Sequence, residues 1–102
     1  MIFAQAIDLD AEAALQVLMN TMAYSRTMDT KGRKMVAGDF RTQARLSQHL
    51  KDIRLILAAA AATGQDLPLS DTHRQLLEAA EAAGFGDADN SAVIRAFEPR
   101  PE

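Results

Sequence analysis

The sequence contains no cysteine, which excludes disulfide frameworks, thiolate zinc sites and cysteine nucleophiles. A chain without cysteine fits a reducing compartment, so we expect a cytoplasmic protein. The sequence also lacks a charged and then apolar leader, and it has no run of about 18 apolar residues that would cross a bilayer. We therefore expect no membrane partner.

Positive charge is scarce as well. The chain has 11 Lys and Arg against 14 Asp and Glu, a net charge of -3. Binding to nucleic acid without sequence preference usually needs roughly 6 to 10 phosphate contacts from Lys and Arg. The one basic cluster, Lys31, Arg33 and Lys34, is interrupted by Gly32 and is typical of a solvated helix face. We predict no nucleic-acid partner.

Strand patterns are missing too, because no segment alternates regularly between apolar and polar residues. The predicted class is therefore all-α. A chain of 102 residues is long enough for a core that needs neither disulfide nor metal. We predict one helical domain over residues 1–102 and no metal site.

The strongest helical signal is in residues 46–63, LSQHLKDIRLILAAAAAT, where apolar residues recur at steps of three and four. The alanine run 58–62 widens this stripe until little polar surface remains on the C-terminal half. Since a helix that is apolar nearly all round is usually buried, we predict a compact bundle around this helix. The residues expected at its centre are Ile53, Ile56, Leu57 and Ala60.

Cap and stop residues predict the helices before this one. The apolar residues 1–7 look like the end of a helix whose beginning is missing. Asp10 is placed to cap a helix over residues 11–22. Ser25 is placed to cap a further helix, which Gly38 and Asp39 end.

The same signals predict the helices that follow. Gly64 and Pro68 end the central helix. Ser70 or Asp71 is expected to cap the next helix, which ends at Gly84. Asn90 or Ser91 is then expected to cap a last short helix through Phe97, before Pro99 and Pro101 close the chain.

Four motifs of the sequence together are typical of one family. They are Lys51-Asp52 within HLKDIRLIL, the pattern GFGDADNSAV with Gly84, Gly86, Asp87, Asp89, Ser91 and Ala92, and the shorter motifs Leu9-Asp10 and Gly38-Asp39-Phe40. With these motifs, essentially the whole chain resembles the C-terminal domain of the β-hydroxyacid dehydrogenases. That family includes 3-hydroxyisobutyrate dehydrogenase, tartronate semialdehyde reductase and the glyoxylate and succinic semialdehyde reductases, and the implied fold is like the C-terminal domain of 6-phosphogluconate dehydrogenase.

Members of that family are about three times as long, and the resemblance implies an upstream Rossmann domain that binds NAD or NADP. It also implies a substrate loop and a long helix with a catalytic lysine. This chain has no GxGxxG motif and no lysine before Lys31. We therefore expect no catalytic residue in it, no cofactor binding by the chain alone, and no turnover of a small hydroxyacid without a missing or separate Rossmann domain.

The resemblance implies site residues at three positions. Lys51 corresponds to a lysine that approaches the bound cofactor, where an ammonium suits phosphate or ribose oxygens; the alternative is a surface lysine beside Asp52. We place Asp52 and Ala44 at the substrate pocket, with Asp52 orienting Lys51 or capping a loop and not acting as a base. The family usually has a phenylalanine where this chain has Ala44, so the pocket would be wider.

Three other titratable residues have simpler interpretations. His49 would be a general base only with a partner at a fixed spacing, and we interpret it as a half-exposed helix residue. Asp87 and Asp89 resemble a calcium loop superficially, but no oxygen ligands continue the pattern. We assign them to turns and caps.

Two hypotheses about function follow. The chain is the C-terminal helical domain of an NAD(P)-dependent hydroxyacid dehydrogenase, or it is a separate helical binding or oligomerisation module that has lost the chemistry. In both cases we predict a homodimer or larger homo-oligomer with the first helix at or near the contact. The chain has more apolar residues in this region than a short bundle of 102 residues can cover: Ile2, Phe3, Ile7, Met19, Met22 and Met28.

Overall fold

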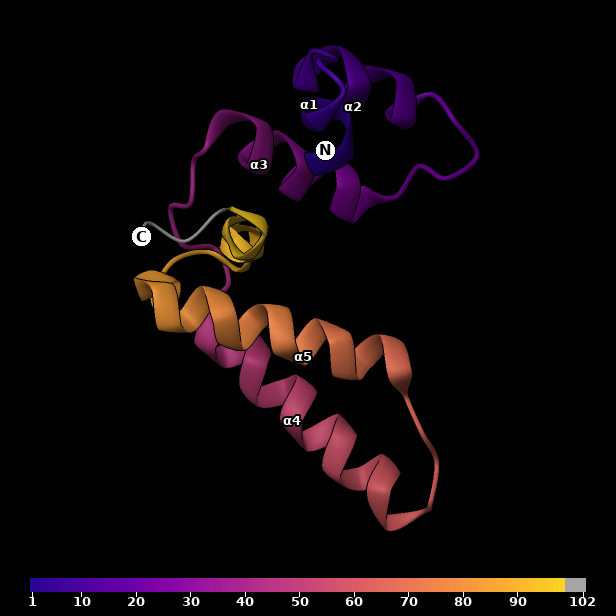
Figure 1. Ribbon diagram of the computed structural model, residues 1–102, viewed down its shortest axis with the longest axis vertical. Coiled ribbons are helices and arrows are strands. Elements are labelled where there is room, and N and C mark those ends of the chain that lie inside the picture. Colours follow the sequence, from indigo (N-terminus) through magenta and orange to yellow (C-terminus); the bar gives the residue numbers. More distant parts are fainter. Residues whose placement is uncertain (99–102) are drawn as a thin grey trace. The chain divides into compact units, whose positions relative to one another are not determined.

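The computed structural model describes residues 1–98, and its regular elements are all helices (Figure 1). Within these residues, extended pairing is limited to an isolated bridge between Arg45 and Asp89. The all-α prediction is confirmed. The predicted closure by Pro99 and Pro101 lies outside the described residues.

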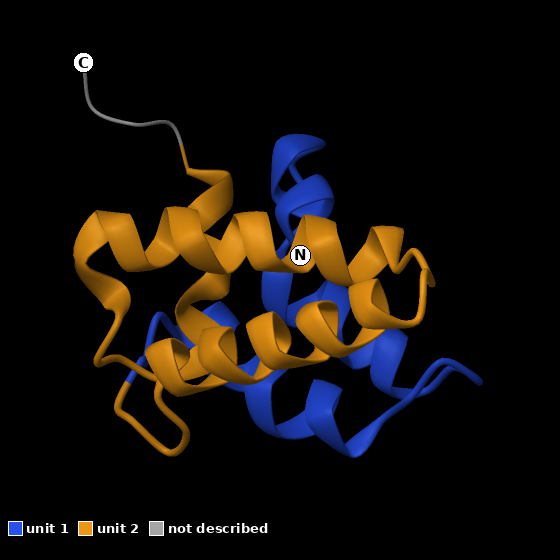
Figure 2. Cartoon of the chain, turned by 90° about the horizontal axis from the view of Figure 1, so that it is seen from below, with its two compact units in different colours: residues 1–40 blue, residues 41–102 orange. Residues whose placement is uncertain are grey.

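The chain divides into two compact units, residues 1–40 and 41–102 (Figure 2). The first unit holds α1, α2, the π-helical turn η1 and α3; the second holds α4, α5, the π-helical turn η2 and the 3₁₀ helix η3. The expectation that residues 1–102 form one domain stays a prediction.

In the first unit, α1 (Ile2–Ala6) is followed by α2 (Ala11–Met19). Asp10 caps α2 as predicted, because its carboxylate accepts a hydrogen bond from the N–H of Ala13 at 2.9 Å. The predicted end near residue 22 is wrong. Side chains of Asn20 and Thr21 bind the carbonyls of the last turn, which ends the helix earlier.

The rest of this unit begins at Ser25, whose hydroxyl accepts a hydrogen bond from the N–H of Met28 at 3.0 Å. This is the predicted cap, and it leads into η1 (Met28–Gly32) and α3 (Arg33–Ala37). Gly38 ends α3 with φ 65°, a left-handed conformation that favours glycine.

In the second unit, α4 (Leu46–Ala62) and α5 (Pro68–Ala80) lie side by side and run in opposite directions (Figures 1 and 2). Gly64, with φ 74°, ends α4 as predicted. The predicted cap of α5 is wrong, because the helix already begins at Pro68. Ser70 and Asp71 lie inside its first turns, and proline at the first position supplies the fixed φ of a helix start.

The chain continues from α5 through η2 (Glu81–Phe85) to η3 (Asn90–Phe97). Gly84 has φ 101°, which fits its predicted role at a helix end. The cap of η3 is Asp89, whose side chain accepts the N–H of Ser91. The prediction of Asn90 or Ser91 as cap is wrong by one or two positions.

The core of the second unit lies at the start of α4, and the predicted burial of its C-terminal half is wrong. Ile53 is buried, but Ile56 is 49% exposed and Leu55 is 61% exposed. The start of α4 bonds to η2 and to the turn before η3 through Leu46 and Ser47. The alanine-rich end of α4 lies away from η2 and η3 (Figure 1). The buried residues of this unit are Leu46, Leu50, Ile53, Leu77, Ala80, Asp89, Ser91 and Ala92.

Candidate functional site

Asp89 holds together the segment that precedes α4 and the start of η3. Its side chain is fully buried. One carboxylate oxygen accepts the backbone N–H of Gln43 at 2.9 Å and of Ala44 at 3.1 Å. The other accepts the N–H and the hydroxyl of Ser91. Four donors therefore satisfy a buried carboxylate and fix the backbone at Ala44.

The turn around Asp89 also caps α4. The N–H of Leu46 donates to the carbonyl of Ala88 and the N–H of Ser47 donates to the carbonyl of Gly86, each at 2.9 Å. A helix N-terminus with free N–H groups is a ready anion site. Here the first two N–H groups are already bonded, so this turn has a structural role at the start of α4. The predicted cap role is confirmed for Asp89, whereas the role of Asp87 stays a prediction.

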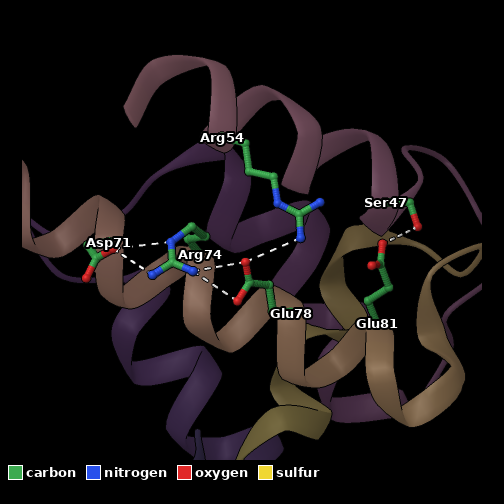
Figure 3. Close-up of polar contacts among 6 residues, drawn as sticks. All are labelled: Ser47, Arg54, Asp71, Arg74, Glu78 and Glu81. Carbon is green, nitrogen blue, oxygen red and sulfur yellow. Dashed lines mark hydrogen bonds and ion pairs between the residues drawn. The ribbon is translucent and has the colours of Figure 1, made fainter. Parts of the chain in front are cut away.

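Gly86 gives this capping turn room beside Ser47. A Cβ at this position would lie 2.6 Å from the hydroxyl oxygen of Ser47, which would have to shift. That hydroxyl donates to the carboxylate of Glu81 at 2.9 Å (Figure 3). The glycine therefore allows the turn to approach α4 closely while Ser47 and Glu81 stay paired.

Lys51 and Asp52 lie on the exposed surface of α4. Within residues 1–98, neither side chain forms a hydrogen bond or an ion pair, so Asp52 does not orient Lys51 in this structure. The reason is geometric, because neighbouring residues of a helix do not face each other. The Lys51 ammonium is thus available to a ligand.

These residues fit part of a site for a nicotinamide dinucleotide. Lys51 supplies an exposed cation without an internal partner, which suits phosphate or ribose oxygens. The capped start of α4 supplies no free N–H cluster in its first two positions. The described residues could therefore supply one contact to a cofactor, but they do not form a complete binding site for its phosphates.

His49 is half-buried on α4, as predicted, and it has a neighbour that the sequence did not reveal. His73 on α5 lies with its ring centre 5.0 Å from that of His49, and the two rings are tilted by 57°. Burial lowers the pKa of His73 below its ordinary value, and the nearby charge of His49 lowers this pKa further. No fixed spacing links two residues on different helices, so sequence reasoning had no signal for this pair.

A network of ion pairs joins α4 and α5 (Figure 3). Arg74 binds Asp71 at 2.8 Å and Glu78 at 2.9 Å, and Arg54 reaches Glu78 at 3.3 Å. Hydrogen bonds from Arg74 lower the pKa of both carboxyl groups, with a smaller effect of Arg54 on Glu78. The spacing of Asp71, Arg74 and Glu78 could have predicted the pairs within α5.

An open groove of about 560 Å³ lies between the end of α4 and the start of α5. Its two arginines, Arg54 and Arg74, already pair with carboxylates. None of Ala44, Lys51 and Asp52 lines it, so the groove and the predicted site residues are separate features. The lining residues are Arg54, Leu57, Ala60, Ala61, Gln65, Asp66, Leu67, Pro68, Asp71 and Arg74.

The described part of the chain contains no group of three or more His, Asp or Glu side chains suited to a metal ion. Among the same residues, no helix is long and apolar enough to cross a membrane.

Comparison with known proteins identifies the fold and the family. Residues 1–97 match the family described as "NAD-binding of NADP-dependent 3-hydroxyisobutyrate dehydrogenase". A crystal structure of 3-hydroxyisobutyrate dehydrogenase from Salmonella typhimurium superposes with a TM-score of 0.89 at 26% identity, over 93% of this chain and 33% of that one. The all-helical fold is therefore that of the C-terminal domain of a hydroxyacid dehydrogenase.

Curated relatives agree with this match. L-threonate dehydrogenase from Pectobacterium atrosepticum is 31% identical over 95% of this chain and 32% of its own length. Cytokine-like nuclear factor N-PAC from Aedes aegypti is 31% identical over 88% of this chain and 16% of its own length. The chain belongs to the NAD-binding family of NADP-dependent 3-hydroxyisobutyrate dehydrogenase, and it spans about a third or less of the length of these relatives.

Proposed function

We propose that this chain acts as the helical domain of an NAD(P)-dependent hydroxyacid dehydrogenase, where it borders the substrate and cofactor cleft and supports oligomerisation. The family match over residues 1–97 is the observation that carries this proposal. Hydride transfer belongs to the nicotinamide cofactor when it is bound. The remaining two thirds of the relatives' length have no counterpart in these residues, so the isolated chain should be inactive.

Lys51 is the residue that we propose to contact the cofactor. Its exposure on α4 and its lack of an internal partner within residues 1–98 support this role. We propose that Ala44 and Asp52 border the substrate. Ala44 suits this because Asp89 holds its backbone while its side chain stays exposed.

The test of Lys51 uses a fusion of this chain to the N-terminal two thirds of L-threonate dehydrogenase from Pectobacterium atrosepticum. Lys51→Ala should raise the KM for the cofactor roughly tenfold or more, since a hydrogen bond to a charged group contributes about 1.5 to 3 kcal/mol. Lys51→Arg should restore part of the affinity. Gln48→Ala is the matched control on the exposed surface of α4. An unchanged KM in Lys51→Ala would remove Lys51 from the cofactor site.

We also propose that the chain forms a homodimer or larger homo-oligomer. Exposed apolar residues of the first unit support this, with Phe3 75% exposed, Val17 67% and Ile7 50%. Exposed apolar residues mark an interface when they form a contiguous patch, and a symmetric contact is the commonest solution. Phe3→Asp should reduce the mass measured by light scattering during gel filtration, whereas Gln5→Asp on the same helix should not. A monomeric native chain at about 100 μM would contradict the proposal.

The second candidate, a helical module without dehydrogenase chemistry, is favoured by one comparison. A relative that contains this domain is named a nuclear factor and not a dehydrogenase. A folded fusion that binds no cofactor would support this alternative. We further propose a cytoplasmic location and no nucleic-acid partner, on the grounds of the missing cysteine and the net charge of -3.

A further inference from the structure

Both histidines of the chain lie at one place. His49 on α4 and His73 on α5 are the only two in the sequence, and their ring centres are 5.0 Å apart. The chain also has no cysteine. The side chains best suited to bind a transition metal are therefore gathered between two helices, in a unit whose helices pack directly on each other.

The ring nitrogens are open to a ligand. Neither imidazole has a hydrogen-bond partner within residues 1–98, and both side chains are half-buried. Among residues 1–98, every side-chain nitrogen or oxygen that is buried has a hydrogen-bond partner. A ring nitrogen without a partner is therefore not buried. The nitrogens of His49 and His73 therefore reach solvent, where an ion can approach them.

The separation of the rings suits a single ion. A metal that binds two imidazoles at about 2.0 to 2.1 Å per nitrogen, with an angle at the metal between a right angle and a tetrahedral one, places the ring centres roughly 4.5 to 5.2 Å apart. The observed 5.0 Å lies inside this range.

We propose that His49 and His73 together bind one divalent transition-metal ion of the zinc or nickel class, with water completing the coordination. Neutral imidazole is a preferred ligand for these ions. No group of three or more ligating side chains occurs in the described residues, so the protein supplies two ligands. The bound ion links α4 to α5 and stabilises their packing, because a ligand that binds the folded state favours it by mass action. This inference is independent of the proposed function.

The test uses the complete chain without a histidine tag, freed of metal by a chelator and kept near pH 7.5, because imidazole must be deprotonated to bind. Titration with NiCl₂ in a calorimeter should give one ion per chain, and the melting temperature should rise with nickel concentration. In proton NMR spectra, both imidazole spin systems should respond to the same equivalent of metal. Absence of binding, or a response from one ring alone, would overturn the proposal.

Variants decide whether the pair is the site. His49→Gln and His73→Gln keep a polar side chain of similar size, and each should weaken nickel binding about tenfold or more while helical circular dichroism is kept. Gln48→Ala, next to His49 on the exposed surface, should bind as the native chain does. If His73→Gln does not fold, His49→Gln decides alone. Binding that is unchanged in either folded variant would place the metal elsewhere and overturn the proposal.

Discussion

At the scale of single residues, Asp89 is the residue on which the start of α4 depends. Its buried carboxylate accepts hydrogen bonds from Gln43, Ala44 and Ser91. Asparagine has the same shape as aspartate, but its carboxamide has a single acceptor oxygen. Its NH₂ group would therefore face N–H or O–H donors that now bond to the carboxylate, and these donors would lose their acceptor. Each buried group left without a partner costs about 1 to 3 kcal/mol.

Asp89→Asn should therefore lower the free energy of unfolding by about 2 kcal/mol or more. Urea denaturation followed by circular dichroism measures this change. Asp87→Asn is the matched control, because the Asp87 side chain is exposed and forms a long ion pair with Arg45 at 3.8 Å. This substitution should change stability by less than about 0.5 kcal/mol. Equal effects of the two substitutions would show that the buried carboxylate has no special role.

His73 predicts a pH dependence of stability. Burial and the charge of His49 lower its pKa below 6.5 in the folded chain, whereas the unfolded chain keeps the ordinary value. Just below pH 6.5 the unfolded chain therefore binds more protons. The free energy of unfolding must rise with pH through this window and level off above it.

Urea denaturation at a series of pH values, in buffer with a metal chelator, measures this slope. His73→Gln should flatten the rise between the lowered folded-state pKa and 6.5. Proton NMR should show the ring of His73 titrating below 6.5. If His73 instead titrates at or above pH 6.5, the burial of its ring beside His49 would be contradicted.

At the scale of elements, the core of the second unit is the first half of α4 and not its alanine run. Leu50 is fully buried, whereas Ile56 on the same helix is 49% exposed. Leu50→Ala should lower the free energy of unfolding by about 2 to 5 kcal/mol, as a buried leucine substitution does. Ile56→Ala should cost clearly less, because its side chain leaves little cavity behind. Denaturation curves that reverse this order would show that the other half of α4 is the core.

The helices themselves were largely predictable, because their signals are local. Asp10, Ser25 and Gly64 end or begin helices where the sequence indicated. The wrong prediction for α4 concerns contacts between residues far apart in the sequence. Helical periodicity located the apolar stripe of α4, but it contained no information about which half the neighbouring elements cover.

In the candidate site, too, the sequence indicated single residues but not the contacts between distant ones. The family resemblance indicates site roles for Lys51, Asp52 and Ala44. All three side chains are exposed, and their roles stay proposals. The bonds from Asp89 to Gln43 and Ala44 join residues far apart in the sequence. So does the contact between His49 and His73. Neither has a spacing that a single sequence could reveal.

At the scale of the whole molecule, the chain supplies about a third of the length of the dehydrogenases that it resembles. The described residues contain a fixed helix start, an exposed lysine and no complete phosphate cradle. This combination is what a domain needs if it completes a cleft whose chemistry lies in another domain. If this chain is such a domain, it should restore activity to a partner domain that carries the chemistry.

The most direct measurement is steady-state reduction of NAD or NADP by the fusion described above, with L-threonate and 3-hydroxyisobutyrate as substrates. The N-terminal piece and this chain, each assayed alone, are the controls. We predict turnover by the fusion and none by either control. A fusion that folds and binds the cofactor, yet turns over no faster than its N-terminal piece alone, would contradict the assignment of this chain as the helical domain of a hydroxyacid dehydrogenase.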